Sequence, residues 1–326
     1  MSQPDCPACQ RSAVDNCEFV DVGEQHKFYA PDVEEVKQAL TAAAAKRTLN
    51  YQMLRCQFCG LEFCDPMCAP SREWYNLAYR AMDLYALERW EFGEVLRRIP
   101  RGARLFEFGC GSGNFLTRCL ENQIPASGMD FSEDGVASCV SKGLDVSRID
   151  LDEITSGGTE RVSHLAAFHF LEHLERPSAL FEHAAAKASP DSHLWVSVPS
   201  DRRATRRFGV IDHLDQPPHH MTRWTPEAFR QIGKRSGWRL TEILYEPVQL
   251  RVALWSITVY SPAYQRLKTA GKFQNRMTEQ AYRAIALPGA LMRRLSSEQI
   301  LSGFAMLAHF TRDAHSESAY TNRHAS

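Results

Sequence analysis

The sequence lacks two features that would fix a partner at once: a charge excess of either sign and a long apolar run. Its 326 residues include 38 Lys and Arg against 39 Asp and Glu, so the formal net charge is only −1. This balance gives no long-range attraction to phosphate backbones, and no nucleic-acid partner is expected. No apolar run reaches the roughly 18 residues of a transmembrane helix, and the opening residues show no signal-peptide pattern. We therefore expect a cytoplasmic protein without a transmembrane segment.

Cysteine is well represented, and its spacing indicates metal binding. Four of the ten cysteines form two Cys-x-x-Cys pairs: Cys6, Cys9, Cys56 and Cys59. In a reducing compartment such pairs hold metal more often than they form disulfides. Two pairs supply the four thiolates of a closed tetrahedral Zn²⁺ site, which would be structural because it leaves no position for water. Two unrelated surface pairs or a redox pair are the alternatives, and Cys64 or Cys68 could replace a predicted ligand.

The segments on either side of the second pair predict helices. Residues 10–55 make a longer gap than a compact zinc ribbon has, and residues 32–49 within it predict an inserted helix. Residues 71–99 repeat apolar and aromatic residues at helical spacing. This second stretch links the cysteine-rich part to the rest of the chain or covers a cofactor, and its aromatics, such as Trp74 and Tyr75, are expected in the core.

From residue 104 the pattern alternates between strand and helix. The strands are expected at RLFEF and ASGMDFS, and the helices at NFLTRCLENQ and EDGVASCVSKG. Such alternation predicts a parallel sheet with helices on its faces, whose ligand lies at the carboxyl ends of the strands.

The turn after the first of these strands indicates a nucleoside ligand. Gly109, Gly111 and Gly113 permit a sharp turn and a close approach of the backbone to a ligand. Asp130, at the end of the next strand, can accept hydrogen bonds from two ribose hydroxyls. A dinucleotide site would have Gly or Ala at position 114, where this chain has Asn114.

Several segments carry a family resemblance. With Glu107, the glycine-rich turn resembles the first motif of class I S-adenosylmethionine-dependent methyltransferases, E/D-x-G-x-G-x-G. Residues 163–177 resemble the family's fourth-strand segment, with Ser163 where Asp is usual and with matches at Phe168, His169, Leu171, Glu172, His173 and Pro177. Residues 217–238 resemble the segment after the fifth strand, and residues 303–312 the final antiparallel strand. With the cysteine pairs, the chain is similar to zinc-ribbon-bearing methyltransferases of sugar and natural-product pathways.

The resemblance implies an α/β fold: a Rossmann-like seven-stranded methyltransferase sheet with a small N-terminal zinc ribbon. It implies S-adenosyl-L-methionine as cofactor and structural Zn²⁺. The expected parts are a zinc ribbon with helical insertion at 1–70, a helical linker or lid at 71–100, a methyltransferase domain at 101–312 with a helical insertion at 257–300, and a disordered tail at 313–326. The cofactor contacts implied are Glu107, Gly109, Cys110, Gly111, Gly113, Asp130, Phe131, Asp150, Leu151, Phe168 and His169.

Histidines are the candidates for catalysis. Methyl transfer mainly requires alignment of the reacting atoms, and a hydroxyl acceptor is helped by a base. The candidate bases are His173, His219 and His220. In the alternative interpretation, either His219 or His220 caps the following helix or hydrogen-bonds to the backbone. Glu172 either orients a neighbouring histidine or forms a salt bridge to Arg176.

The acceptor and the attacking atom stay open. Four arginines in an expected loop at residues 201–209 favour a small, anionic acceptor such as a nucleotide-linked sugar, although a solvated loop explains them as well. The insertion at 257–300 could act as a lid, mediate a homodimer or lie on a membrane surface. The alternative functions are an RNA methyltransferase and a non-catalytic S-adenosylmethionine-binding scaffold. Residues 1–30 contain only Arg11 and Lys27 as basic residues, which argues against a ribbon that grips RNA.

Overall fold

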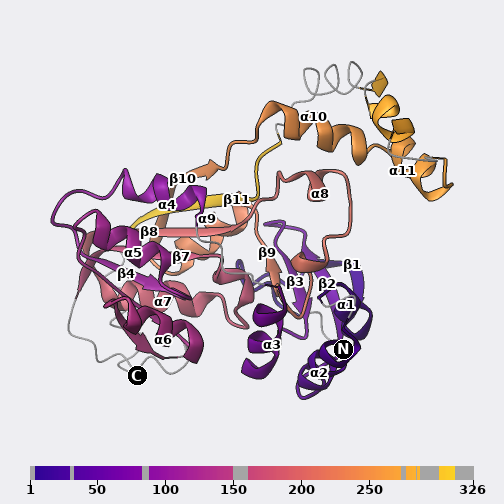
Figure 1. Cartoon of the computed structure of the whole chain (residues 1–326). Coiled ribbons are helices and arrows are strands. Elements are labelled where there is room, and N and C mark those ends of the chain that lie inside the picture. The colour runs from indigo at the N-terminus through magenta and orange to yellow at the C-terminus, as the bar shows by residue number, and fades with distance from the viewer. Residues whose placement is uncertain are drawn as a thin grey trace. The chain divides into compact units, whose positions relative to one another are not determined.

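The computed structural model describes residues 4–29, 33–82, 88–149, 161–272, 277–283, 285–286 and 301–312 (Figure 1). The chain divides into two units. The first comprises Met1–Val198, His213–Leu244 and Leu307–Ser326, and the second comprises Pro199–Asp212 and Tyr245–Met306. The expected tail at 313–326 lies outside the described residues.

The first unit contains a four-stranded N-terminal sheet with the order β1-β2-β3-β9. Its strands are β1 Val14–Asp21, β2 Asn50–Cys56, β3 Glu62–Asp65 and β9 Thr222–Arg223. Each neighbouring pair is antiparallel. The fourth strand comes from a distant part of the chain, so the N-terminal sheet is not built from N-terminal residues alone.

Three helices accompany this sheet. α1 Val22–Tyr29 and α2 Glu34–Ala45 connect β1 to β2, and α3 Arg72–Met82 follows β3. The inserted helix predicted at 32–49 is confirmed as α2, which buries Leu40, Ala43 and Ala44 at the spacing of one helical face. β1 and α1, in the same gap, were not predicted. The helical stretch at 71–99 forms α3 and α4 Trp90–Leu96, with residues 83–87 outside the described part.

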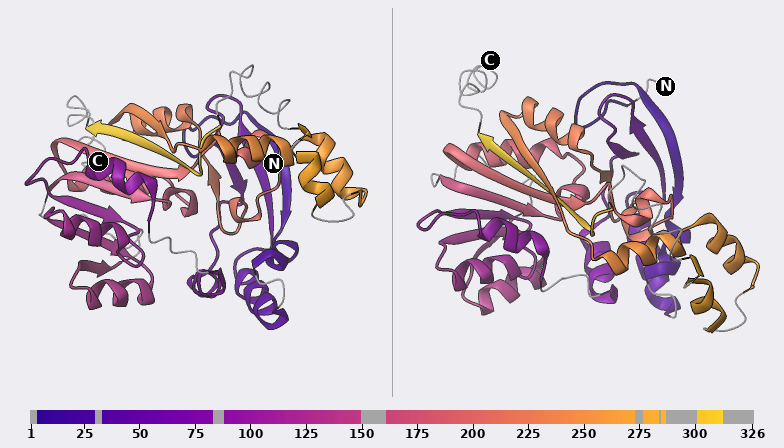
Figure 2. Two further views of the ribbon diagram at one scale, coloured as in Figure 1. Left: turned by 45° about the horizontal axis from the view of Figure 1, so that its top comes forward. Right: turned by 90° about the horizontal axis from the view of Figure 1, so that it is seen from above.

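A seven-stranded sheet forms the rest of the first unit, as predicted. Its order is β10-β11-β8-β7-β4-β5-β6. The strands are β4 Leu105–Phe108, β5 Ala126–Asp130, β6 Asp145–Arg148, β7 Val162–Phe168, β8 Ala188–Pro199, β10 Trp238–Tyr245 and β11 Ala305–Arg312. The pairs β4–β5, β4–β7, β5–β6 and β7–β8 are parallel, and the arrow of β11 points opposite to that of β8 (Figure 2).

Helices cover both faces of the seven-stranded sheet (Figure 2). They are α4, α5 Asn114–Glu121, α6 Glu133–Ser141, α7 Ser178–Lys187 and α9 Pro226–Arg235. All four residues of β4 are buried, as expected for the central strand of a sheet that is covered on both sides. Because β4 runs parallel to both β5 and β7, the carboxyl ends of these three strands meet at one edge of the sheet.

The second unit is helical in its described part. It contains α8 Ala204–Arg207, α10 Leu250–Val259 and α11 Pro262–Thr269. Ala253, Ile257 and Leu301 form its small core. The arginine-rich segment 201–209 was predicted to be a loop, and this is wrong in part because residues 204–207 form α8. Residues 273–276, 284 and 287–300 of the predicted insertion lie outside the described part. Among the described residues, no helix is both long and apolar enough to cross a membrane.

Candidate functional site

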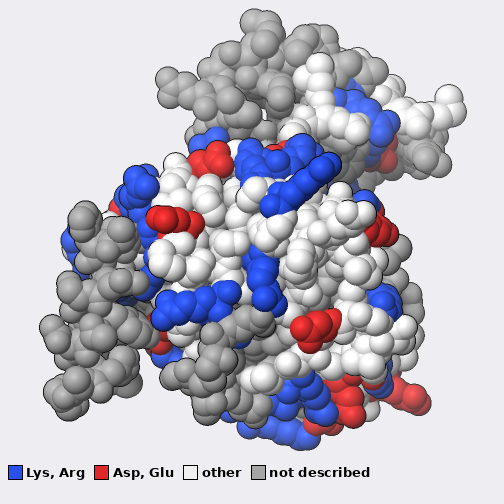
Figure 3. All heavy atoms as spheres, turned by 90° about the vertical axis from the view of Figure 1, so that its left-hand side faces the viewer, with Lys and Arg blue, Asp and Glu red and all other residues white. Residues whose placement is uncertain are grey.

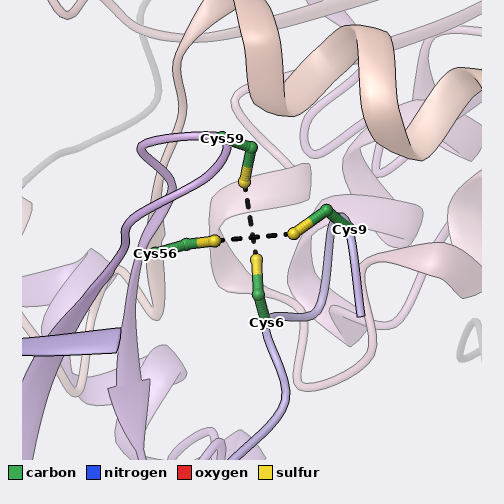
Figure 4. A group of neighbouring side chains, drawn as sticks. All are labelled: Cys6, Cys9, Cys56 and Cys59. Atoms are coloured by element: carbon green, nitrogen blue, oxygen red, sulfur yellow. Dashed lines mark hydrogen bonds between the residues drawn. The ribbon is translucent and has the colours of Figure 1, made fainter. Parts of the chain in front are cut away.

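The four predicted metal ligands come together. Cys6 and Cys9 precede β1, Cys56 ends β2, and Cys59 lies in the turn that follows (Figure 4). Their sulfur atoms all lie within 4.8 Å of one another, with Cys6 Sγ 3.5 Å from Cys59 Sγ and Cys9 Sγ 3.5 Å from Cys56 Sγ. The hydrogen bond with Cys59 lowers the pKa of the Cys6 thiol to about 5. This donor set suits a tetrahedral thiolate site.

Neither of the two alternative ligands belongs to this cluster. Cys64, in β3, is buried, and its Sγ lies 3.2 Å from the carbonyl oxygen of Pro66. The sulfur of Cys68 is not among those that gather at the two Cys-x-x-Cys pairs. All four cluster thiols are free of disulfide bonds.

The turn between β4 and α5 is a glycine loop, residues 109–113, in which two of the glycines leave no room for a Cβ atom. Gly109 and Gly113 have φ values of +68° and +78°, in the left-handed region. A Cβ atom at Gly109 would lie 2.3 Å from the Phe170 ring, and one at Gly113 would lie 2.5 Å from Cδ1 of Leu144. Glycine is therefore required at both positions for the chain to turn at the carboxyl end of β4.

Two carboxylates stand beside this loop. Asp130, at the end of β5, accepts the backbone N–H groups of Gly111 and Ser132, both at 2.7 Å. Glu107 in β4 is only 3% exposed, and burial together with the charge of Asp130 raises its pKa well above the usual value. Its Oε2 has no hydrogen-bond partner among the described residues. A ligand N–H or O–H group would provide the missing partner.

The other predicted cofactor contacts differ in their surroundings. Cys110 is buried in the core of the first unit. The Phe131 ring lies 5.7 Å from that of Tyr75, and the Phe168 ring packs 4.7 Å from that of Phe115 in the core. Asp150 and Leu151 lie outside the described residues.

His169 is held between two buried glutamates. Its Nε2 lies 3.0 Å from Glu91 Oε1, and its Nδ1 lies 3.1 Å from Glu172 Oε1. Burial opposes a charge here, but the bonds to Glu172 and Glu91 raise the pKa of His169 above its usual value. Its φ is +48°, a strained conformation for a non-glycine residue. Of the two roles considered for Glu172, the structure therefore favours orientation of a histidine, because Arg176 pairs instead with Glu182 at 2.9 Å.

The three candidate catalytic histidines form a histidine cluster, defined as His173, His219 and His220. One ring nitrogen of each lies within 4.8 Å of those of the other two. His173 ends the short helix η2 Leu171–His173 after β7, and the other two precede β9. Burial lowers the pKa of His173 to about 4 and that of His219 well below its usual value. The imidazoles of His173 and His219 are therefore neutral at physiological pH.

Neither His219 nor His220 caps the following helix, which corrects one alternative. The side chain of Thr225 caps α9 by accepting the N–H of Ala228. Nδ1 of His219 lies 2.9 Å from the carbonyl oxygen of Leu214, which is a backbone bond of the kind considered. Nδ1 of His220 lies 3.0 Å from Oδ1 of Asp215.

The N-terminal sheet positions this histidine pair. The N–H of Cys64 donates to the carbonyl oxygen of Met221 at 3.0 Å, so the residue after His220 is bonded to β3. Arg223 in β9 contacts Glu62 of β3 at 3.1 Å and Asp215 at 3.1 Å. Asp215 thus links Arg223 to His220, which is a connection that sequence reasoning missed.

Aromatic side chains of α3 also contact the histidine cluster. The Tyr75 ring lies 5.8 Å from that of His173, and the Trp74 ring lies 6.2 Å from that of His219. The Tyr75 hydroxyl is buried and has no hydrogen-bond partner among the described residues. These aromatics are core residues, as predicted, and they also form a wall of the site. Tyr75 lies between Phe131 at the loop after β5 and the histidine cluster.

Two further expectations concern residues away from the cluster. Ser163, which replaces the family's usual Asp, still hydrogen-bonds to the N–H of Arg104, at 3.3 Å. In the second unit, Arg203 donates to the carbonyl oxygen of Ser200 at 2.9 Å, and the Arg202 guanidinium lies 3.8 Å from the centre of the Tyr245 ring. These two arginines are therefore already engaged within their own unit.

Comparisons with known proteins agree with the fold. A solved S-adenosylmethionine-dependent methyltransferase from Archaeoglobus fulgidus matches with 21% identity and a TM-score of 0.50, over 73% of this chain and 100% of that one. A cyclopropane synthase from Mycobacterium tuberculosis matches with 17% identity and a TM-score of 0.42, over 68% of this chain and 82% of that one. The likeness of fold rests on the first of these structures. No curated protein sequence gives a significant match.

The sequence itself assigns the family. The profile described as "Methyltransferase domain" matches residues 76–243, slightly more than half of the 326 residues. This range begins in α3 and ends in β10, so it includes the glycine loop, Asp130 and the histidine cluster. The chain belongs to the methyltransferase domain family.

Proposed function

We propose that this protein transfers a methyl group from S-adenosyl-L-methionine to a small-molecule acceptor. One observation carries the proposal: a buried glutamate whose Oε2 has no hydrogen-bond partner among the described residues, Glu107, stands two residues before a tightly packed glycine loop. Such a carboxyl group suits a ligand that carries a cationic N–H group, and the cofactor's amino acid part has one. Membership of the methyltransferase family provides the reaction class.

The cofactor would lie along the carboxyl ends of β4 and β5. The glycine loop would make room for its methionine part, and Glu107 would accept a hydrogen bond from its ammonium group. Asp130, which ends β5 beside the glycine loop, would accept hydrogen bonds from the ribose hydroxyls. Cys110 and Phe131 would flank the cofactor as neighbours of these groups.

The acceptor would meet the cofactor at the histidine cluster. In the transfer, the acceptor atom bonds to the methyl carbon, and the carbon–sulfur bond breaks with its electron pair going to sulfur. A hydroxyl acceptor also loses a proton. His173 is the first candidate to take it, because burial lowers the pKa of its imidazole and keeps it neutral, whereas two glutamates raise the pKa of His169.

A glycine substitution tests the cofactor site. Gly111→Val places a branched side chain in the glycine loop, and we expect a loss of S-adenosylmethionine binding in calorimetry. Gly143→Val is the matched control, because Gly143 also has a positive φ, +72°, and no atom within 4 Å of an added Cβ. Wild-type affinity in a folded Gly111→Val protein would contradict the proposed cofactor site.

We also propose that the four-cysteine cluster holds structural Zn²⁺. A structural zinc site contributes on the order of 10 kcal/mol of folding free energy. Cys9→Ser should therefore lose the ion and unfold the N-terminal sheet, whereas Cys64→Ser, outside the cluster, should retain the ion. Elemental analysis of the purified proteins measures this. Zinc-free wild-type protein, or a disulfide between Cys6 and Cys9, would contradict the assignment.

The class of acceptor is a further proposal. A nucleotide-linked sugar or a natural-product intermediate is favoured by the family resemblance of the sequence. An RNA acceptor is less favoured: on the face drawn in Figure 3, Lys and Arg side chains lie in separate groups with Asp and Glu among them. Turnover assays with anionic sugars, neutral sugars and RNA discriminate these acceptors. Cofactor binding without turnover on any of them would support the scaffold alternative.

A further inference from the structure

The three imidazoles of the histidine cluster share one geometric feature: the Nδ1 atom of each bonds to an oxygen atom. Nδ1 of His173 lies 2.6 Å from the carbonyl oxygen of His219, and Nδ1 of His219 lies 2.9 Å from that of Leu214. A carbonyl oxygen only accepts, so both Nδ1 atoms carry a hydrogen. The Asp215 carboxylate has the same effect on His220. On each ring, Nε2 is therefore the atom left with a lone pair.

One of these lone pairs, that of His219, has no partner among the described residues. His219 and His220 are 6% and 5% exposed. Nε2 of His219 is buried without a hydrogen-bond partner among the described residues, and so is the hydroxyl of Tyr75, whose ring lies beside that of His173. A buried polar atom without a partner is unfavourable unless something binds it. The buried Nε2 of His219 therefore indicates a bound group that accepts its lone pair.

We propose that His173, His219 and His220 bind a divalent transition-metal ion of the zinc, cobalt or nickel type. Imidazole nitrogens suit these ions, whereas Mg²⁺ and Ca²⁺ prefer oxygen. Metal-ligating histidines usually donate their other N–H to a carbonyl or carboxylate oxygen, as all three do here. Tetrahedral bonds of about 2.1 Å place ligand nitrogens about 3.4 Å apart, and one ring nitrogen of each histidine already lies within 4.8 Å of those of the other two.

The proposed site differs in kind from the four-cysteine cluster. Four thiolates make a closed shell, whereas three imidazoles leave a coordination position open. In the proposed methyl transfer, on which this role rests, that position would receive the acceptor's hydroxyl oxygen. With His173 bound to the ion, the hydroxyl proton would go to water instead of to His173, after which the oxygen bonds to the methyl carbon and the carbon–sulfur bond breaks toward sulfur. The ion would thus orient the acceptor and remove the need for a strong base.

Metal binding can be measured without cofactor or acceptor. We would prepare the full chain with a single Zn²⁺ ion per chain, which the four thiolates hold, and titrate it with Co²⁺ by calorimetry. The visible spectrum is followed at the same time, because imidazole-bound Co²⁺ lacks the thiolate charge-transfer bands of a cysteine site. We expect one further Co²⁺ ion per chain. His219→Ala and His220→Ala should each weaken Co²⁺ binding by roughly 100-fold or more, and Asp215→Asn by about 10- to 100-fold.

The matched control comes from a second histidine group on the sheet. His193 is stacked between His164 and His309, with ring centres 4.9 Å and 5.1 Å away, and its Nδ1 bonds to Nε2 of His309. His193→Ala should leave Co²⁺ binding unchanged. Should His219→Ala fail to fold, the partly exposed His173→Ala provides the same test.

Two results would overturn the metal site: no Co²⁺ binding beyond the cysteine cluster, or binding that survives the loss of two cluster histidines. Cofactor affinity is measured separately in the same proteins. Normal S-adenosylmethionine binding with no Co²⁺ binding would reject the metal site alone. Co²⁺ binding without S-adenosylmethionine binding would instead reject the proposed function while leaving the metal site in place.

Discussion

A substitution at Glu107 should stabilise the protein while it weakens cofactor binding. The Oε2 atom of this glutamate is buried without a hydrogen-bond partner among the described residues. An unsatisfied buried group costs about 1–3 kcal/mol, and more if it is charged. Glu107→Met keeps the length of the side chain and removes this cost. We therefore expect the free energy of unfolding to rise by about 1–3 kcal/mol.

The same substitution removes the proposed partner of the cofactor's ammonium group. A hydrogen bond to a charged group contributes about 1.5–3 kcal/mol, so S-adenosylmethionine affinity should fall roughly 10- to 150-fold. Urea denaturation without cofactor measures the first effect, and calorimetry measures the second. A Glu107→Met protein that is less stable than wild type and binds the cofactor equally well would refute both the unpaired state and the proposed contact.

A second buried glutamate provides the matched control for this experiment. Glu62 is 2% exposed, but its carboxylate contacts Arg55 and Arg223. Removal of one partner from a buried ion pair costs about 3–5 kcal/mol. Glu62→Met should therefore destabilise the protein by about that amount, which is opposite in sign to Glu107→Met. Because Glu62 lies in β3, its loss should leave the glycine loop and the intrinsic cofactor site unaltered.

Three further predictions concern the scaffold of the site. In urea denaturation, Gly109→Ala should lower the free energy of unfolding by about 1–3 kcal/mol more than Gly102→Ala does. The added Cβ at Gly109 meets the Phe170 ring at 2.3 Å, whereas Gly102 has open space around it. Equal losses in the two variants would contradict the tight packing of the glycine loop. Burial lowers the pKa of His164 from 6.5 to about 4. The unfolded chain therefore takes up a proton at a higher pH than the folded chain does. Up to about 3 kcal/mol of unfolding free energy is lost as the pH falls from 6.5 to 4. Denaturation midpoints at pH 7.5 and 4.5 should show a smaller difference in His164→Phe. Arg223→Met should lower the free energy of unfolding by about 3–5 kcal/mol and reduce kcat more than it reduces cofactor affinity. A wild-type kcat would show that β9 does not position the histidines.

The parts of the site that sequence predicts are those with local signals. The glycine loop and Asp130 follow strands whose apolar pattern is clear, and consecutive strand ends in a parallel sheet meet at one edge. The two Cys-x-x-Cys pairs likewise have a short spacing that is set by a turn. For these groups, the position along the chain is enough to place them together in space.

The connections that sequence reasoning missed depend on distant pairing. β9 has only two residues, and its register with β3 joins Thr222 to Phe63 across the length of the chain. No periodicity can appear in so short a strand. The contact between Arg223 and Glu62 follows from that register. Similarly, the helical turn in α8 has too few residues to show a helical pattern, which is why an arginine-rich loop was expected there.

The pairing of β9 with β3 also affects how far the chain can be divided. The boundary expected at residue 70 would separate β1, β2 and β3 from the strand that completes their sheet. A shortened chain starting at residue 71 would retain all seven strands of the large sheet and both histidines before β9, yet it would lose the backbone bond from Cys64 that anchors Met221. Residues 1–70 therefore do not form a separate domain, because their sheet includes β9. An ancestral exchange of this part between relatives would have had to preserve the match with residues 221–223, so the two parts are expected to be inherited together.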